Sequence, residues 1–480
     1  MPDKVHGQHL SAAGLLITLG IIFGDIGTSP LYVIQAILHN RVVSEELIYG
    51  GMSCVFWTLL IITTGKYVLL ALKADNKGEG GIFALYALVR RYKSKYVIYP
   101  AIIGCATLIA DGFITPPISI SSAVEGLNML FPDTHINTVP IVIGIIIGLF
   151  TFQQVGTQTV GKSFGPIMFI WFSMIGILGF LQVLEHPEIL KSLNPAYAIN
   201  LLSKYPGGFW ILGAVFLCTT GGEALYSDLG HCGKSNIRVS WIFVLLALLL
   251  SYMGQSAFLV SEYNGSSIVG PDGHADFRIF FRIMPDWFLP IGVAIATLAT
   301  IIASQALISG VFTLTNEAMK LHLWPRLRVN FPTTFRGQVY IPSINWFLMI
   351  GCIIVVLIFR KSENMEAAYG LAITIDMIMT TLLLGFFYRI RFHSFYIPLL
   401  GTILLLFVES TFLIANLDKF MHGGWFSLMI AIPIAIMVFV LYNASKIRQK
   451  HTMFVELKDY IPVLQDLQND QTIPKEASHL

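Results

Sequence analysis

Charged residues are scarce in this sequence. Asp, Glu, Lys and Arg make up 12% of its 480 residues, whereas a soluble domain carries about a quarter. Hydrophobic residues make up 55%, and the mean hydropathy is +0.71. This balance excludes an ordinary soluble domain. The net charge of +2 offers no basic surface, so no nucleic-acid partner is expected. We expect lipid to be the main surrounding of the chain.

Cysteine pairs and clustered metal ligands are also missing. Four of the five cysteines lie in apolar segments, and none forms a Cys-x-x-Cys pair. We interpret all five as reduced packing residues, without a disulfide framework or a zinc site. Neither a Ser/His/Asp set nor a histidine cluster recurs within one apolar segment. The sequence therefore does not indicate an enzyme, and no cofactor is expected.

One nucleotide-binding motif occurs without its usual surroundings. Residues 156–163 match the phosphate-loop pattern G-x-x-x-x-G-K-S. That loop requires a preceding strand, a following helix and a nucleotide-binding fold. Here it falls in a short loop between two apolar segments, and we do not expect ATP binding.

Long apolar stretches predict twelve transmembrane helices, since about 20 apolar residues cross a bilayer. The predicted spans are residues 13–37, 48–72, 98–129, 138–155, 164–184, 209–227, 238–261, 288–316, 341–359, 366–388, 394–415 and 424–443. The domain division that follows is a cytoplasmic N-terminus (1–12), a transmembrane domain (13–443) and a cytoplasmic tail (444–480). The tail could begin a soluble domain that this sequence does not contain.

The orientation of these spans follows from the basic residues in the loops. If the N-terminus is cytoplasmic, 21 Lys and Arg lie in the inner segments and 8 in the outer ones. Such an excess on the inside is typical of membrane proteins. We therefore expect a multi-pass protein of the cell membrane with both termini in the cytoplasm. Lys66 lies within the second span, and we expect it to snorkel towards the inner surface.

Two spans are interrupted at corresponding places. Residues 24–30 of the first span read GDIGTSP, and residues 219–223 of the sixth read TTGGE. Glycine and proline disfavour a continuous helix, and irregular backbone at this depth must be buried in protein or line a wet cavity. If spans 1–5 and 6–10 are inverted repeats, the breaks are equivalent and indicate a binding site near the membrane midplane. Two unrelated packing kinks are the alternative.

Carboxylates within the spans indicate a cation. Asp25 and Glu223 lie in the two breaks, and Asp111 lies in the middle of the third span. An ionisable side chain at such depth is costly and is functional by default. Thr115 and Ser119 follow Asp111 at i+4 and i+8, which places three oxygen-bearing side chains near one helix face. Tyr32 lies about two turns after Asp25. Carboxylate, hydroxyl and freed carbonyl oxygens can together replace the water around a cation.

Other acidic residues have less specific interpretations. Glu125 and Glu317 lie near span ends, where ordinary solvation is expected. Asp376 and Glu409 lie within spans, and each is either a site residue or a structural one. Both alternatives stay open at this stage.

An energy source is needed to import a cation against its gradient, and the chain has no nucleotide-binding domain. A proton carried by a buried carboxylate is the simplest source, because burial favours the neutral acid and a nearby cation favours the charged form. Glu223 and Asp25 are the candidates because both lie in flexible breaks. Glu223 is preferred because Gly221 and Gly222 precede it.

Four motifs resemble signatures of the KUP (HAK/KUP/KT) family of potassium uptake transporters. They are residues 24–32, 73–81, 111–119 and 220–226, and the resemblance extends over about residues 12–445. It implies symport of potassium ions and protons on an all-α fold like that of LeuT, with two inverted five-helix repeats plus two helices. The residues that match the ion-site positions of the family are Asp25, Tyr32, Asp111, Thr115, Ser119, Thr220, Glu223 and Tyr369. Family members commonly continue into a cytoplasmic domain, so a homodimer built through such a domain stays open for this chain.

Three other classes compete with this interpretation. An amino-acid transporter of the same fold would hold a substrate carboxylate at the broken helices, but Asp25, Asp111 and Glu223 would repel it. A potassium channel would need a Thr-Val-Gly-Tyr-Gly filter, which the sequence lacks. A membrane enzyme would need a catalytic cluster, and none recurs within a span.

Overall fold

The protein is described here by a computed structural model that covers residues 10–39, 41–76, 78–92, 96–131, 136–155, 158–268, 278–331, 339–392, 395–451 and 457–469. Its regular structure within these ranges is helical, apart from two isolated antiparallel bridges. Ten helices are long and apolar enough to cross a membrane, and a bent pair at the start of the chain gives an eleventh. The predicted all-α, multi-pass fold class is therefore confirmed.

The helices follow the predicted order. Their bounds are α1 (Ala12–Ile21), α2 (Gly24–Thr28), α3 (Val33–Leu38), α4 (Glu45–Thr58), α5 (Gly81–Arg90), α6 (Ile98–Asp111), α7 (Thr115–Val124), α8 (Leu127–Leu130), α9 (Thr138–Phe152), α10 (Gln158–Glu185), α11 (Pro195–Lys204), α12 (Leu212–Val215), α13 (Gly222–Ser227), α14 (Leu229–Cys232), α15 (Lys234–Tyr263), α16 (Ile279–Arg282), α17 (Leu289–Lys320), α18 (Pro342–Phe359), α19 (Ser362–Arg391), α20 (Tyr396–Asp418), α21 (Gly424–His451) and α22 (Leu457–Asn469). The predicted fourth span is the shortest, a 15-residue apolar helix, α9.

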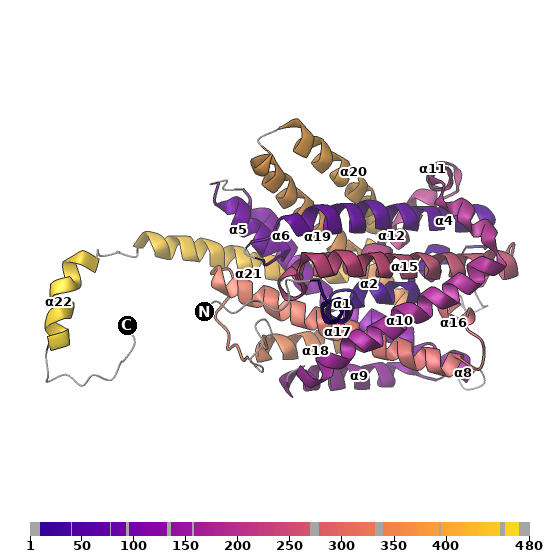
Figure 1. Cartoon of the computed structure of the whole chain (residues 1–480), viewed down its shortest axis with the longest axis horizontal. Coiled ribbons are helices and arrows are strands. Elements are labelled where there is room, and N and C mark those ends of the chain that lie inside the picture. The colour runs from indigo at the N-terminus through magenta and orange to yellow at the C-terminus, as the bar shows by residue number, and fades with distance from the viewer. Residues whose placement is uncertain are drawn as a thin grey trace.

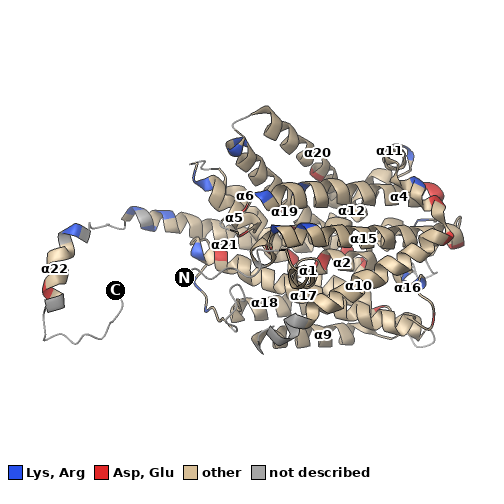
Figure 2. Ribbon diagram, viewed as in Figure 1, with Lys and Arg blue, Asp and Glu red and all other residues tan. Residues whose placement is uncertain are grey.

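The long helices run side by side in one bundle, and α21 extends beyond it towards the separate α22 (Figure 1). Figure 2 shows that Lys and Arg gather mainly at the end of the bundle from which α21 leaves, while a few acidic residues lie in its middle near α2. The nucleotide-type motif falls where α10 begins: residues 156 and 157 lie outside the described ranges, and Gln158 already starts the helix.

The predicted break in the first span is present. The segment Gly24–Leu31 turns away from α1 by 68°. Two carbonyl groups freed by this turn are bound by side chains from other helices: Trp171 Nε1 donates to the Gly27 oxygen at 2.9 Å, and Gln255 Nε2 donates to the Pro30 oxygen at 3.1 Å. These bonds satisfy the irregular backbone inside the protein, as its depth requires.

The predicted break in the sixth span is also present. The span runs through α12 and the 3₁₀ segment η7 (Phe216–Thr219) before α13 begins. Gly221 joins η7 to α13 with φ +85, a left-handed conformation that favours glycine. A Cβ atom at Gly221 would lie 2.6 Å from the Ile26 backbone nitrogen. The glycine therefore allows the two interrupted spans to touch.

The third span has a break that the sequence prediction missed. The sequence analysis placed Asp111 in the middle of the third span, but α6 ends at Asp111, a turn covers residues 112–114, and α7 starts at Thr115. Pro116 has no N–H to donate to the Gly112 carbonyl, which accepts instead from Cys352 Sγ at 3.6 Å. The prolines therefore interrupt the helix where only a bend was expected.

The second span has an unpredicted geometry. After α4 it continues as a π-helical segment, η2 (Leu59–Leu70), which contains Lys66 and Tyr67. A π-helix bonds i to i+5 and shifts the register of side chains relative to an α-helix, and such segments are frequent at functional sites. In this protein it places two polar side chains in the interior, both 0% exposed.

Candidate cation site

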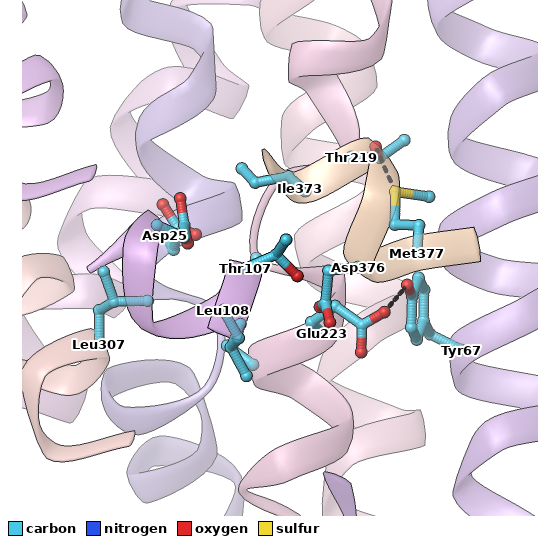
Figure 3. A pocket seen from close by; sticks show the side chains of 13 residues that line it. Asp25, Tyr67, Thr107, Leu108, Thr219, Glu223, Leu307, Ile373, Asp376 and Met377 are labelled. Atoms are coloured by element: carbon cyan, nitrogen blue, oxygen red, sulfur yellow. Dashed lines mark hydrogen bonds between the residues drawn. The ribbon is translucent and has the colours of Figure 1, made fainter. Parts of the chain in front are cut away.

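Four carboxylates from four helices line one internal cavity. Asp25 comes from α2, Asp111 from the end of α6, Glu223 from α13 and Asp376 from the middle of α19. Each is at most 6% exposed. Figure 3 labels Asp25, Glu223 and Asp376 among the side chains that line the cavity, with Glu223 and Asp376 next to Tyr67. The breaks in spans one, three and six therefore bring together the three carboxylates named from the sequence.

A cluster of hydroxyl groups adjoins these carboxylates. Thr115 Oγ1 donates to Asp111 Oδ1 at 2.8 Å, which confirms that the i+4 spacing survives the break. The Thr220 hydroxyl lies 2.9 Å from that of Ser29 in the first break. Ser119 lies 3.4 Å from the Thr28 hydroxyl.

Two tyrosines complete the hydroxyl cluster. The Tyr32 hydroxyl lies 3.4 Å from that of Ser29, and the Tyr369 hydroxyl lies 3.5 Å from Asp25 Oδ1. Both side chains are 0% exposed. All eight residues named for the ion site are thus buried around the contact between the interrupted spans.

The charge of this region is unbalanced. Among the described residues, no ion pair involves Asp25, Asp111, Glu223 or Asp376. The one lysine nearby, Lys66, is held by a fifth carboxylate. Unpaired charge costs several kcal/mol at such depth. Protons or bound cations are required to neutralise the cavity.

The expectation for Lys66 was wrong. Its side chain is 0% exposed and does not reach the surface. Lys66 Nζ lies 2.8 Å from Glu409 Oε1 and also donates to the Tyr67 hydroxyl at 3.0 Å and the Met377 carbonyl at 2.7 Å. Thr381 donates to the same Glu409 oxygen at 2.8 Å. Glu409, left open in the sequence analysis, is thus the ion-pair partner of Lys66.

Tyr67 links this ion pair to the cavity. Its hydroxyl accepts from Lys66 and donates to Glu223 Oε1. Sequence reasoning did not identify Tyr67, because an aromatic residue in a span gives no sign of its partner. The polar chain therefore runs from Glu409 through Lys66 and Tyr67 to Glu223.

The expectation for Glu125 was also wrong. It was expected to be solvated, but it is 7% exposed and accepts from both the backbone N–H and the hydroxyl of Ser362 at 2.8 Å. Arg278 forms an ion pair with it. Glu125 thus fastens the end of the third span to the start of α19.

The second signature segment, residues 73–81, packs against the C-terminal end of the sixth span. Tyr226 donates to the Ala74 carbonyl at 2.6 Å, and a Cβ atom at Gly80 would lie 1.9 Å from the Tyr226 carbonyl oxygen. Asp75 pairs with Lys234 and accepts from the Gly78 N–H. Burial raises the pKa of Asp75, but these two partners outweigh burial and hold that pKa below its usual range. The segment therefore packs directly against the helix that bears Glu223.

Comparisons with known proteins agree with this geometry. Residues 12–446 match the family model described as the K+ potassium transporter integral membrane domain. A protein of Flavobacterium johnsoniae named "Probable potassium transport system protein Kup" is 55% identical over 475 residues, which cover 98% of this chain and 72% of the relative. Proteins of the same name from Cytophaga hutchinsonii and Streptococcus agalactiae are 54% and 48% identical, over 100% and 97% of this chain and 72% and 70% of each relative.

A solved manganese transporter of Eremococcus coleocola superposes loosely on the chain. The alignment covers 93% of this chain and 98% of the transporter, with 12% identity and a TM-score of 0.43. That similarity is too low to add to the comparison.

The buried ion pair gives a stability prediction. Lys66→Met leaves Glu409 buried without its partner and should lower the free energy of unfolding by about 3–5 kcal/mol. Adding Glu409→Gln removes the stranded charge and should recover most of that loss. The melting temperatures of the purified variants in one detergent measure both effects.

The matched control is Lys191→Met, which breaks the exposed pair with Glu188 and should cost less than about 1 kcal/mol. If the double variant Lys66→Met/Glu409→Gln is no more stable than Lys66→Met, the unpaired charge of Glu409 is not the cause of the lost stability.

Proposed function

Since this chain belongs to the family of potassium transporters that its residues 12–446 match, we propose that it takes up potassium ions by symport with protons. The family makes it an integral, multi-pass membrane transporter rather than an enzyme. The observation that carries the proposal is the cavity lined by four buried carboxylates, three of which stand at interrupted spans. Such a cavity attracts cations and requires them, or protons, for neutrality.

Potassium is proposed to bind between the first, third and sixth spans. Asp111, Thr115, Thr220 and Asp25 are the proposed ligands, with Tyr32, Ser119 and Tyr369 beside them. Their support is the shared burial of these oxygens and the contacts that join them across the breaks. Neutral and charged oxygens in fixed positions can replace the hydration shell of a weakly hydrated cation. Backbone carbonyls are a smaller part of the site than expected, because Trp171 and Gln255 occupy those of Gly27 and Pro30.

The rival amino-acid transporter is disfavoured by the same cavity. A substrate carboxylate would meet four side chains of its own charge, and neither Lys nor Arg is among the described residues that line the cavity. A helix N-terminus supplies only a partial positive charge. Recognition of an anionic substrate would need more positive charge than this.

Glu223 is the proposed proton carrier. It follows the Gly221 hinge, and it accepts a hydrogen bond from Tyr67. Movement at the hinge would exchange that bond for access to the inner end of span six, which the segment of Ala74 and Gly80 covers. Asp25, in the other break, is the second candidate. A proton could then leave or enter Glu223 as potassium occupies or vacates the cavity.

We further propose that both termini are cytoplasmic and that the protein lies in the cell membrane. The support is the gathering of Lys and Arg at the end of the bundle from which α21 leaves (Figure 2).

Replacing Asp111 tests the potassium site. Asp111→Asn keeps the volume of the side chain but removes its charge, and potassium uptake should fall at least about tenfold, the effect of losing roughly 1.4 kcal/mol of binding. Uptake of rubidium tracer by cells that lack other potassium importers measures this, with membrane insertion checked by the amount of protein in the membrane. Asp286→Asn is the matched control, because Asp286 is exposed. Uptake near the parent rate in Asp111→Asn would contradict the site.

Replacing Glu223 tests the coupling. Glu223→Gln still accepts a hydrogen bond from Tyr67 but cannot titrate. Potassium uptake into vesicles containing this variant should no longer respond to an imposed pH gradient, while the parent protein should respond. Acidification of the lumen in step with potassium entry in Glu223→Gln would exclude Glu223 as the carrier and leave Asp25 as the next residue to replace.

A further inference from the structure

Asp376 is the least satisfied carboxylate in the cavity. It lies in the middle of α19, is 1% exposed, and neither of its oxygens has a hydrogen-bond partner among the described residues. A buried carboxylate in this condition is strongly destabilising. Its side chain lines the cavity beside Glu223 (Figure 3). The occupant that satisfies it must therefore come from the cavity.

The hydroxyl groups around Asp376 offer acceptors to the cavity. Thr107 Oγ1 donates to the Ile103 carbonyl at 3.0 Å and to that of Gly104 at 3.1 Å. Thr219 Oγ1 donates to the Phe216 carbonyl at 2.8 Å. A hydroxyl has one proton and two lone pairs. The Thr219 hydroxyl also lies 3.9 Å from Met377 Sδ, a second acceptor for its single proton. Because acceptors in the protein use both protons, both hydroxyls present lone pairs to the cavity.

The ammonium group of Lys66 has no hydrogen-bond donor left for Asp376. A lysine ammonium has three donors, and Lys66 directs its own to Tyr67, Met377 and Glu409. Tyr67 in turn donates its proton to Glu223. No donor of this polar chain therefore remains for Asp376.

The space at Asp376 suits a small occupant. The cavity has room for a water-sized particle, and a potassium ion is about as large as a water molecule. Gly104 of α6 helps to keep this space open, because a Cβ atom there would lie 2.8 Å from Asp376 Oδ1. A proton on Asp376 could form a hydrogen bond to only one neighbouring oxygen. A cation in the cavity would instead attract the oxygens of Asp376, Glu223, Thr107 and Thr219 at once.

We propose that Asp376, Glu223, Thr107 and Thr219 form a second binding site for a monovalent cation of potassium size. This site adjoins the one at Asp25 and Asp111 but uses different side chains, so that one cation can occupy each. The identity of the ion rests on the proposed function. Asp376 is then a direct ligand, and Glu223 serves both as ligand and as proton carrier, so that its proton and the second cation compete for one carboxylate.

Counting bound ions tests this proposal. Potassium-free protein in lipid nanodiscs is titrated with radioactive rubidium at equilibrium, and the number bound per chain is measured with and without excess potassium. The parent should bind two rubidium ions that potassium displaces, and Asp376→Asn should bind one. An unchanged number in Asp376→Asn, or one ion in the parent, would overturn the second site, including the case in which Asp376 holds only a proton.

Further variants keep this test decisive if Asp376→Asn is poorly folded. Thr107→Val keeps the side-chain shape but removes one ligand oxygen, and it should raise the dissociation constant of one of the two ions about tenfold. Equal constants in Thr107→Val and the parent would contradict the site. Asp286→Asn should still bind two ions with parent affinity. A parent protein that binds no rubidium would contradict the proposed function itself, which separates that failure from failure of the second site alone.

Discussion

An ionised carboxylate without an ion-pair partner is poorly tolerated inside a membrane protein, and one cavity of this chain is lined by four carboxylates that form no ion pair among the described residues. The rest of the structure can be understood from that constraint. Lys66 is fixed by Glu409, and its remaining donors are used by Tyr67 and the Met377 carbonyl. The positive charge of Lys66 therefore does not neutralise the carboxylates that line the cavity. Neutrality of the cavity therefore requires bound cations or protons.

Irregular helices create this arrangement. A continuous α-helix would engage every backbone group and direct its side chains in a fixed register. Here a 68° bend, a proline-induced turn, a left-handed glycine and a π-helical segment each change that register at the depth of the cavity. The freed backbone groups are bound by side chains such as Trp171 and Gln255. The irregularities therefore remain stable while they direct carboxylates and hydroxyls inwards.

Local chemistry made part of the site predictable. Asp25 and Glu223 stand within glycine-rich interruptions, and Thr115 lies one turn after Asp111, so each could be found from its immediate neighbours. Lys66 could not, because the carboxylate that holds it lies 343 residues further along the chain. The break after Asp111 was underestimated because the effect of Pro116 depends on what happens to the carbonyl it leaves free. Sequence alone also left the role of Asp376 open, since nothing nearby in the chain indicates that it lacks a donor.

The central claim is that cations carried by the protein, rather than its own side chains, neutralise the cavity. An experimental structure of the protein prepared with thallium in place of potassium tests this directly, because the heavy ion can be located by its scattering. The account predicts thallium beside Asp25 and Asp111, displaced by added potassium and absent at that position in Asp111→Asn. A cavity free of thallium, or one neutralised by Lys66 turned towards Asp111, would contradict it.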